Sequence, residues 1–403
     1  MPQNDALARR NAVILAGAQG LAGANASVVI ATGGLVGAML APSTDWATAP
    51  ITAFVLGTAL ATMPAAWLMR VLGRRDAYRI GAAIGAVAGL ISAFAVREAS
   101  FWVFMVATLM CGGYQAFVIS YRFGATDHAS VTLRPKLISY VTLGGLASAI
   151  VGPQLVIHTQ DLWPPYTFMA SYVGQALVAA LSILLLSALR FPPNPPVVNA
   201  DDKARPLADI FRSKRLRVAV FCGAIAQALM NLIMTATPLA MVGCAHSTTD
   251  ATLAIQWHIV GMFAPGLFTG TLINRFGVYR VMTLGLVLLA GCGAVALAGV
   301  SVPHFFAALI LLGLGWNFTF VGASTLVTEG LRPSERTRVQ GFNDLIVFAT
   351  TSLASLSAGK ILAGFGWGTL NMTIFPFVLL AAVLVFWLAR HERDQERDTA
   401  GRV

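Results

Sequence analysis

The stretch FPPNPPVVNADDKARPLADIFRSKRLR, residues 191–217, interrupts a chain that is otherwise dominated by long apolar runs. It is too polar to cross a bilayer, and its prolines prevent it from starting as a helix. Further along, Leu207, Ile210 and Phe211, followed by Lys214 and Arg215, fit a short helix at the membrane interface. The stretch separates six apolar runs from six others, so it predicts two membrane bundles joined by a polar linker.

The composition of the whole chain indicates a membrane protein. Of the 403 residues, 57% are hydrophobic and 11% are charged, whereas a soluble protein has about 25% charged residues. Too few polar side chains are present to cover a water-soluble globule, which excludes a soluble enzyme. Since a spanning helix needs about 20 apolar residues, we expect twelve spans, near residues 12–38, 47–69, 77–96, 101–121, 137–157, 165–189, 218–242, 253–273, 279–299, 304–327, 341–362 and 368–389.

The distribution of basic residues predicts how the spans are oriented. With the N-terminus in the cytoplasm and the spans alternating, every Lys and Arg except Arg97 and Lys360 falls on the cytoplasmic side. Basic residues concentrate in the cytoplasmic loops of membrane proteins. We therefore expect both termini in the cytoplasm, and the net charge of +10 requires no nucleic-acid partner.

The two halves of the chain carry similar short motifs in the same order. The matches lie 198 to 204 residues apart and pair Gly73-Arg74-Arg75 with Arg275-Phe276-Gly277, Gly113-Tyr114-Gln115 with Gly315-Trp316-Asn317, and Leu133-Arg134-Pro135 with Leu331-Arg332-Pro333. A nearly constant offset favours an internal duplication. The sequence therefore predicts a repeated unit of six spans.

Twelve spans, a central cytoplasmic linker and a duplicated six-span unit resemble the major facilitator superfamily. The resemblance implies an all-α polytopic membrane protein built from two pseudo-symmetric six-helix bundles. It places the N-terminal bundle at residues 1–190, the linker at 191–217, the C-terminal bundle at 218–390 and a cytoplasmic tail at 391–403.

The loops after spans 2 and 8 are similar to a loop signature of that superfamily. The matching residues are Gly73, Arg74, Arg75, Gly270, Arg275 and Gly277. The resemblance implies that these loops help to gate the cytoplasmic side. Arg70 and Asn274 stand where the superfamily has Asp, which removes the acidic member of its usual charge relay. A simpler physical alternative is that the arginines bind anionic lipid headgroups.

Neutral polar residues supply the candidates for substrate binding, because the resemblance implies a central cavity lined by spans 1, 4, 7 and 10. The candidates are Gln19, Asn25, Tyr114, Gln115, Gln227, Asn231, Gln256, His258, Trp316 and Asn317. Amides both donate and accept, which suits a neutral ligand with carbonyl and N–H groups. Hydrogen bonds between helices are the alternative role for each amide. His258 is either a proton-coupling group or a hydrogen-bonded structural histidine.

The sequence favours a secondary transporter over other classes of membrane protein. It has no nucleotide-binding loop, and its scattered histidines and cysteines have no metal-ligand spacing, so we expect no enzyme, catalytic residue, metal or cofactor. Two alternatives stay open. Ser148, Gly152 and Pro153 match part of the span 5 signature of proton-driven drug exporters. The scaffold also suits a non-transporting membrane sensor or assembly factor.

Four further stretches resemble a bacterial branch of the superfamily that includes riboflavin transporters. They are YRFGATD at 121–127, RPKLISYV at 134–141, QWH at 256–258 with GMFAP at 261–265, and QGFND at 340–344. The resemblance implies a multi-pass protein of the bacterial inner membrane that moves a small, neutral, planar solute by alternating access, with riboflavin import as the specific expectation. The expected partners are this solute and membrane lipids, and the expected state is a monomer.

Overall fold

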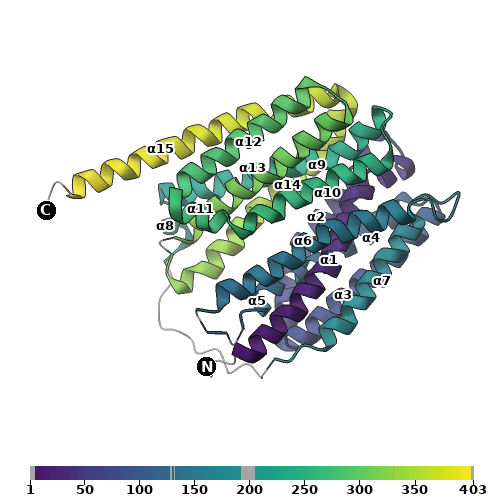
Figure 1. Cartoon of the computed structure of the whole chain (residues 1–403), viewed down its shortest axis with the longest axis horizontal. Helices are drawn as coiled ribbons and strands as arrows, with labels where there is room; N and C mark the ends of the chain where they lie inside the picture. Colours follow the sequence, from purple (N-terminus) through teal and green to yellow (C-terminus); the bar gives the residue numbers. More distant parts are fainter. Residues whose placement is uncertain (1–4, 128, 131, 192–204, 330, 401–403) are drawn as a thin grey trace.

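A computed structural model describes residues 5–127, 129–130, 132–191, 205–329 and 331–400, and these residues form helices joined by short loops (Figure 1). The N-terminal half contains α1 (Asp5–Leu40), η1 (Thr44–Trp46), α2 (Ala49–Val71), α3 (Arg74–Arg97), α4 (Phe101–Ile119), α5 (Tyr121–Gly124), α6 (Arg134–Thr159) and α7 (Met169–Ser187). The C-terminal half contains α8 (Leu207–Ile210), α9 (Lys214–Gly243), α10 (Thr248–Phe263), η2 (Ala264–Leu267), α11 (Thr269–Phe276), α12 (Val278–Ala298), α13 (Val302–Thr328), α14 (Pro333–Met372) and α15 (Ile374–Ala400). Residues 192–204 of the predicted linker and 401–403 of the predicted tail lie outside the described residues.

Within those ranges, ten helices are long and apolar enough to cross a membrane, or eleven if the bent pair α10–η2 and α11 is one span. The two spans expected at 341–362 and 368–389 fall inside a single apolar interval, Arg338–Gln395. Gly366, with φ of 79°, breaks the helical path inside α14. An all-helical membrane fold is therefore confirmed, while the count of twelve spans and the cytoplasmic position of the termini stay predictions.

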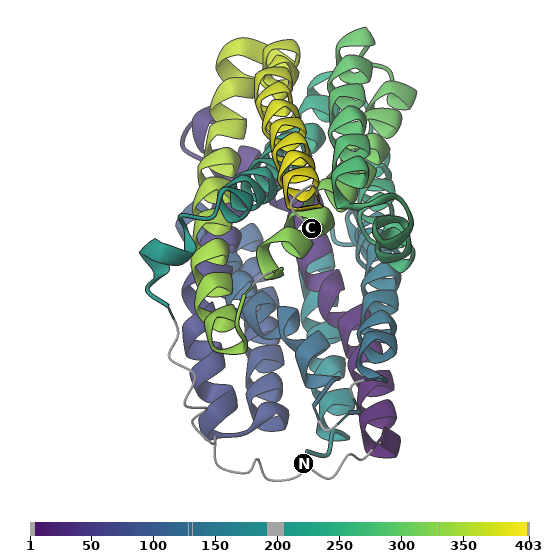
Figure 2. The same cartoon turned by 90° about the vertical axis from the view of Figure 1, so that its left-hand side faces the viewer.

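The two halves pack their helices in the same pairs. Here α1–α7 are called the N-terminal bundle and α9–α15 the C-terminal bundle. In the first, α1 packs on α6, α2 on α4, and α3 on both α4 and α7. In the second, α9 packs on α14, α10 on α13, and α12 on both α13 and α15. These pairs are equivalent in chain order, as a duplicated unit requires, and the bundles lie side by side in both views (Figures 1 and 2).

Glycines let helices approach closely inside the N-terminal bundle. A Cβ atom on Gly112 of α4 would lie 2.0 Å from the carbonyl oxygen of Phe54 on α2. Two glycines of α3 also serve packing, because Gly81 and Gly85 lie against the rings of Phe117 and Tyr114. Lipid is as apolar as the helix side chains, so the hydrophobic effect does not drive membrane helices together, and close packing contacts stabilise their association instead.

Two glycines begin equivalent helices in the two halves. Gly73 precedes α3 with φ of 80°, and Gly277 precedes α12 with φ of 86°. This left-handed region is open to glycine and costly for most other residues. The repeated motif detected in the sequence is thus a repeated backbone turn.

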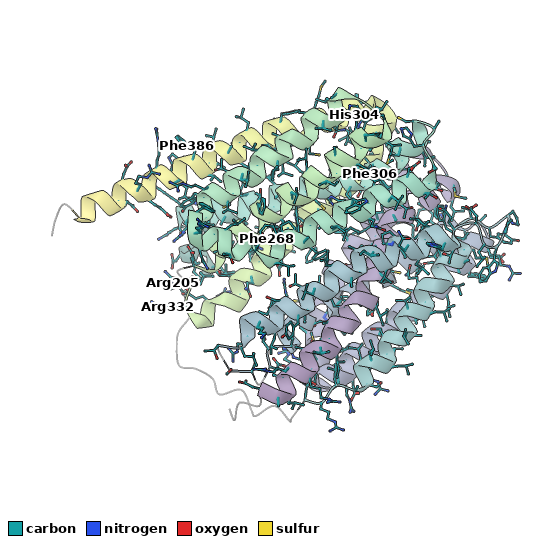
Figure 3. All side chains as sticks on the ribbon, viewed as in Figure 1. Arg205, Phe268, His304, Phe306, Arg332 and Phe386 are labelled. Atoms are coloured by element: carbon teal, nitrogen blue, oxygen red, sulfur yellow. The ribbon has the colours of Figure 1, made fainter. Side chains whose placement is uncertain are left out.

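The end of the linker docks onto the C-terminal bundle. Arg205 donates from Nε and Nη2 to the two carboxylate oxygens of Glu335, at 2.7 and 2.8 Å. The backbone N–H of Arg332 also donates to Glu335, at 3.1 Å, and Figure 3 places Arg205 beside Arg332 at the start of α14. Ile210 is buried, and Phe211 makes an edge contact with Phe342 at 4.9 Å. Linker and α14 are therefore coupled by both charge and packing.

The predicted interfacial helix is shorter than expected. Only Leu207–Ile210 is helical before a turn, and Lys214 already belongs to α9. Ser213 caps α9 by accepting a hydrogen bond from the N–H of Leu216 at 3.4 Å. Leu207, Ile210 and Phe211 pack against the C-terminal bundle. An amphipathic pattern can arise from packing on protein as well as on lipid, so the sequence pattern alone did not separate the two.

Hydrogen bonds join the two bundles at the end of the molecule opposite the linker, called the far end here. Thr48 Oγ1 donates to the carbonyl of Ser355 at 3.0 Å, and Gln160 Nε2 donates to Thr249 Oγ1 at 3.2 Å. Toward the linker end, which carries α8 and the start of α14, the ribbons of the two bundles diverge (Figure 1). The bundles are therefore joined by hydrogen bonds at the far end.

The close approach of α2 and α4 predicts a sharp difference between two adjacent glycines. The Gly112→Ala substitution should destabilise the protein by about 1–3 kcal/mol, because the new methyl group overlaps backbone. Gly113→Ala is the matched control, since its Cβ would meet only Ala61, at 3.9 Å. Thermal unfolding in detergent measures both. Equal unfolding midpoints for the two variants would contradict the packing described here.

The Arg205–Glu335 pair predicts a pH-dependent stability. Hydrogen bonds from Arg205 lower the pKa of Glu335 from 4.5 to about 2. Because the folded-state pKa is depressed, the contribution of the carboxylate is complete above about pH 4.5 and is lost as the pH falls toward 2. The Glu335→Gln variant should therefore unfold at a lower temperature than the natural protein at pH 7, and this gap should shrink below about pH 4.5.

Unfolding midpoints between about pH 7 and pH 3 measure this gap. Glu98→Gln is a suitable control, because the side chain of Glu98 is 49% exposed beside Arg97. A gap for Glu335→Gln that does not change with pH would show that the pair contributes nothing through ionisation.

Candidate functional site

A cavity of about 220 Å³ lies between the two bundles and is partly open. Five polar side chains line it from the N-terminal bundle: Gln19, Ser27, Thr58, Gln115 and Ser148. Three line it from the C-terminal bundle: Gln227, Asn231 and Thr351. All of these side chains are neutral, so the polar part of the cavity offers hydrogen bonds without net charge.

The rest of the cavity wall is apolar and contains flat or flexible groups. Its larger members are Phe54, Met230, Met234, Met262, Phe263 and Phe348. Aromatic faces accept stacked planar ligands, and the thioether chain of Met adapts to irregular shapes. The wall therefore suits a planar ligand with a polar edge.

The orientation of Gln227 in this cavity is fixed by a neighbouring tryptophan. Trp316 Nε1 donates to Gln227 Oε1 at 2.8 Å. Indole N–H is a donor only, so its partner must be the amide oxygen. The Trp316 ring is held in turn by Phe320, with the rings stacked at 5.1 Å. Gln227 therefore keeps its amino group for another partner.

Asn231 lies one turn further along α9 and has a similar arrangement. Thr235 Oγ1 donates to Asn231 Oδ1 at 3.3 Å, which leaves the amino group of Asn231 as its remaining polar group. The same face of α9 carries Gln227, Asn231, Met230 and Met234 into the cavity lining. This wall of the C-terminal bundle therefore presents hydrogen-bond donors.

With respect to the described residues, Gln115 on α4 has an unpaired hydrogen-bond acceptor, whereas Gln227 and Asn231 have free donors. Its Oε1 atom is buried, and the described residues provide it with no hydrogen-bond donor. A buried acceptor without a donor costs about 1–3 kcal/mol. Among the amides that line the cavity, Gln115 is thus the one whose acceptor is buried and unpaired.

Of the ten residues predicted to contact substrate, four line the cavity: Gln19, Gln115, Gln227 and Asn231. Two more, Trp316 and Gln256, lie outside the cavity lining. Trp316 orients Gln227, and Gln256 accepts a hydrogen bond from Gln154 Nε2 at 2.8 Å, which joins the bundles.

Three more of the predicted residues lie inside the helix packing. Asn25 is buried and accepts from Gln175 Nε2 at 2.6 Å, and the Tyr114 hydroxyl donates to Ser182 at 3.3 Å. His258 is fully buried, with Nδ1 2.9 Å from the carbonyl oxygen of Leu309, which fits the structural alternative. The structure therefore places these three side chains outside the cavity lining.

Asn317 contacts both sides of a bend in the eighth predicted span, residues 253–273. Pro265 cannot continue the helical hydrogen bonds, and the axis bends by 52° between Leu267 and Thr269. Asn317 Nδ2 donates to the carbonyl of Met262 at 2.7 Å, and the Thr269 hydroxyl donates to Asn317 Oδ1 at 2.6 Å. Gln115 and Asn317 thus occupy matching positions in the repeats but face different surroundings.

The predicted gating residues lie at the start of α3, in α11 and in the turns that precede α3 and α12, at the linker end. Arg74 pairs with Asp127 and donates from Nη1 to the Tyr78 hydroxyl at 3.1 Å, all within the N-terminal bundle. Arg75 contacts the neighbouring Asp76 at 3.2 Å. In the second copy, Arg275 lies 5.3 Å from the centre of the Phe276 ring. Gly270 lies in α11, and Gly73 and Gly277 form the turns described above.

Several lining residues were missed by the sequence analysis, mainly hydroxyl and thioether side chains in apolar runs. Ser27 lies on the face of α1 that carries Gln19, and Met230 and Met234 lie on the face of α9 that carries Gln227. Helical periodicity from each predicted amide would have found them. Phe348 and Thr351 of α14 had no such signal, because span 11 carried no predicted site residue.

A metal centre has no support in the part of the chain that the structure covers. No group of three or more His, Cys, Asp or Glu side chains there is placed to hold a metal ion. The four cysteines are free, and three of them are buried.

Known proteins match this chain over nearly its whole length. The family model of the Major Facilitator Superfamily matches residues 15–255 and 219–402. The riboflavin transporter RfnT of Brucella anthropi is 48% identical over 377 residues, which cover 93% of this chain and 95% of that protein.

Solved structures share the fold at low sequence identity. A D-xylose–proton symporter superposes with a TM-score of 0.74 at 16% identity, covering 93% of this chain and 97% of the symporter. The nucleoside transporter NupG superposes with a TM-score of 0.69 at 15% identity, covering 95% of this chain and 98% of that one. Together with the family match, they lead to one conclusion: the chain belongs to the major facilitator superfamily.

Proposed function

We propose that this membrane transporter imports riboflavin, or a solute with the same flat and neutral chemistry, across the bacterial inner membrane. The observation that carries the proposal is the uncharged cavity between the bundles, with amides on one part of its wall and aromatic and thioether groups on the rest. The resemblance to a protein named riboflavin transporter, at 48% identity, supports the same substrate.

The chemistry of riboflavin suits such a wall. Its tricyclic ring is planar and neutral, and its pyrimidine edge carries an N–H group between two carbonyls. Phe54, Phe263 and Phe348 offer faces for the ring, and the amides Gln115, Gln227 and Asn231 offer donors and acceptors for the edge. An anionic solute would instead need an Arg or Lys in the cavity, because a buried charge requires a charged partner.

The joined far end and the divergent linker end support a transport cycle based on rocking bundles. If the basic linker end faces the cytoplasm, as the positive-inside rule indicates, this conformation is open toward the cytoplasm. The loops with Arg74 and Arg275 would then close that side in the alternate state, when the far end opens. Transporters of repeated bundles commonly alternate access around a site at the bundle interface.

Drug efflux is the competing direction of transport, and it is supported by one placement. Ser148, which matches part of the exporter signature, lines the cavity. Gly152 of the same signature lies against Ser27 and Ala24, where a Cβ would come within 2.5 Å of Ser27. Helix packing therefore explains that part of the match without any transport direction.

Uptake of labelled riboflavin by a riboflavin-auxotrophic bacterium tests the proposal. Cells that express the chain should accumulate riboflavin in a saturable manner above empty-vector cells. A protonophore arm shows whether a proton gradient drives the uptake. Absence of uptake by protein located in the membrane would contradict riboflavin import, and faster loss of preloaded compound would favour efflux.

Two amides on neighbouring helices should respond differently to substitution. The Gln227→Met variant should raise the half-saturation concentration about 5- to 150-fold, because a donor inside the cavity is lost. The Asn317→Leu variant should instead lower the unfolding temperature, because the carbonyl of Met262 loses its donor. Uptake kinetics and thermal unfolding of both variants check this contrast. Wild-type affinity in Gln227→Met would remove Gln227 from the site.

A further inference from the structure

The two bundles offer different hydrogen-bonding groups to the cavity, with donors on the C-terminal bundle and an acceptor on the N-terminal bundle. On the C-terminal bundle, Trp316 occupies the oxygen of Gln227 and Thr235 occupies the oxygen of Asn231. Both side chains therefore retain amino groups, which can only donate. This side of the cavity is matched to acceptors on the solute, such as carbonyl oxygens.

The N-terminal bundle supplies the complementary group at Gln115. Its oxygen is buried and unpaired with respect to every described residue, although the side chain lines the cavity. The terminal torsion of glutamine is broad, so a small rotation brings this oxygen to a donor that enters the cavity. A solute with one N–H group would remove the cost of the unpaired acceptor.

The imide edge of the isoalloxazine ring has the required order of groups. Its N3–H donor stands between the C2 and C4 carbonyls, so an acceptor in the protein must be flanked by donors. Gln115 provides the acceptor, and Gln227 and Asn231 provide donors on the facing bundle. The ring faces remain free to contact Phe54, Phe263 and Phe348.

We propose that Gln115 accepts the N3–H of the flavin ring while Gln227, held by Trp316, donates to an adjacent carbonyl, so that the imide edge bridges the two bundles. This inference rests on riboflavin import and adds which edge of the ring is recognised, and by which residues. Gln115 is then a specificity-determining residue, and Trp316 is a positioning residue that acts through Gln227.

A methyl group on N3 removes the donor that Gln115 would accept, so it tests whether the imide edge is bound in this orientation. We would measure inhibition of labelled riboflavin uptake by unlabelled riboflavin, by 3-methylriboflavin and by lumiflavin, which keeps the imide but lacks the ribityl chain. In the natural protein, 3-methylriboflavin should bind at least about tenfold more weakly than riboflavin, since a site built around a hydrogen bond rejects the analogue that lacks it.

The Gln115→Ala variant should lose that discrimination. Riboflavin and lumiflavin should weaken by the same factor, while 3-methylriboflavin should change little, so that the ratio of 3-methylriboflavin to riboflavin approaches one. Gln19→Ala is the matched control, because Gln19 is another amide of the N-terminal bundle in the cavity lining. That variant should keep the discrimination of the natural protein.

Trp316→Phe tests the positioning role separately. The phenyl ring keeps a stacking surface toward Phe320 but has no N–H for Gln227. The half-saturation concentration should rise by about fivefold or more, with an unchanged maximal rate. A lower maximal rate with an unchanged half-saturation concentration would contradict this role.

The outcomes distinguish the two levels of the proposal. Riboflavin uptake with no discrimination against 3-methylriboflavin, or with equal discrimination in Gln115→Ala, overturns the orientation and leaves riboflavin import in place. Absence of riboflavin uptake by the natural protein overturns both. Discrimination that disappears only in Gln115→Ala supports the orientation.

Discussion

The free-energy cost of an unpaired polar group in an apolar environment organises this molecule. A chain with 57% hydrophobic residues has few places where such a group meets water, so each one needs a partner inside the protein. Where α10 ends at Phe263, Asn317 donates to the carbonyl of Met262. Where Asn25 is buried, Gln175 pairs with it. Nine buried side-chain atoms of the described residues have no hydrogen-bond partner, and among them the oxygen of Gln115 is the one whose side chain lines the cavity between the bundles.

The same constraint separates structural from functional polar residues. Asn25, Tyr114 and Asn317 have hydrogen-bond partners on neighbouring helices, so they fix the shape of each bundle. Gln227 has a partner for only one of its two polar groups, and that partner determines what it offers to a ligand. Rigid bundles with a few incompletely paired groups at their interface are suited to binding a solute and to moving as units around it.

The sequence predicted the fold well because the fold depends on features that a sequence displays directly. The length of apolar runs, the side on which arginines lie and the repeated Gly73 and Gly277 turns follow from local chemistry. The superfamily was recognised correctly from these features and the linker. The length of an apolar run does not show a bend, and the span predicted at 253–273 bends by 52° between Leu267 and Thr269.

The candidate site was harder to predict, because periodicity shows which residues share a helix face but not what lies opposite. Gln227 and Asn231 lie on one face of α9, and that face meets the cavity. Asn317 lies in the repeat position of Gln115, but the break in α10 gives it a nearer partner. Such a difference between equivalent residues arises from tertiary packing, and so the sequence alone could not provide it.

We propose that the cavity recognises a planar solute through neutral groups alone. Equilibrium binding of riboflavin and of its 5′-phosphate to the purified protein, followed by flavin fluorescence, distinguishes recognition by neutral groups from recognition by charge. We expect riboflavin to bind and the phosphate ester to bind at least about tenfold more weakly, because no cation in the cavity lining compensates the buried charge. Equal or tighter binding of the phosphate ester would rule out recognition by neutral groups alone.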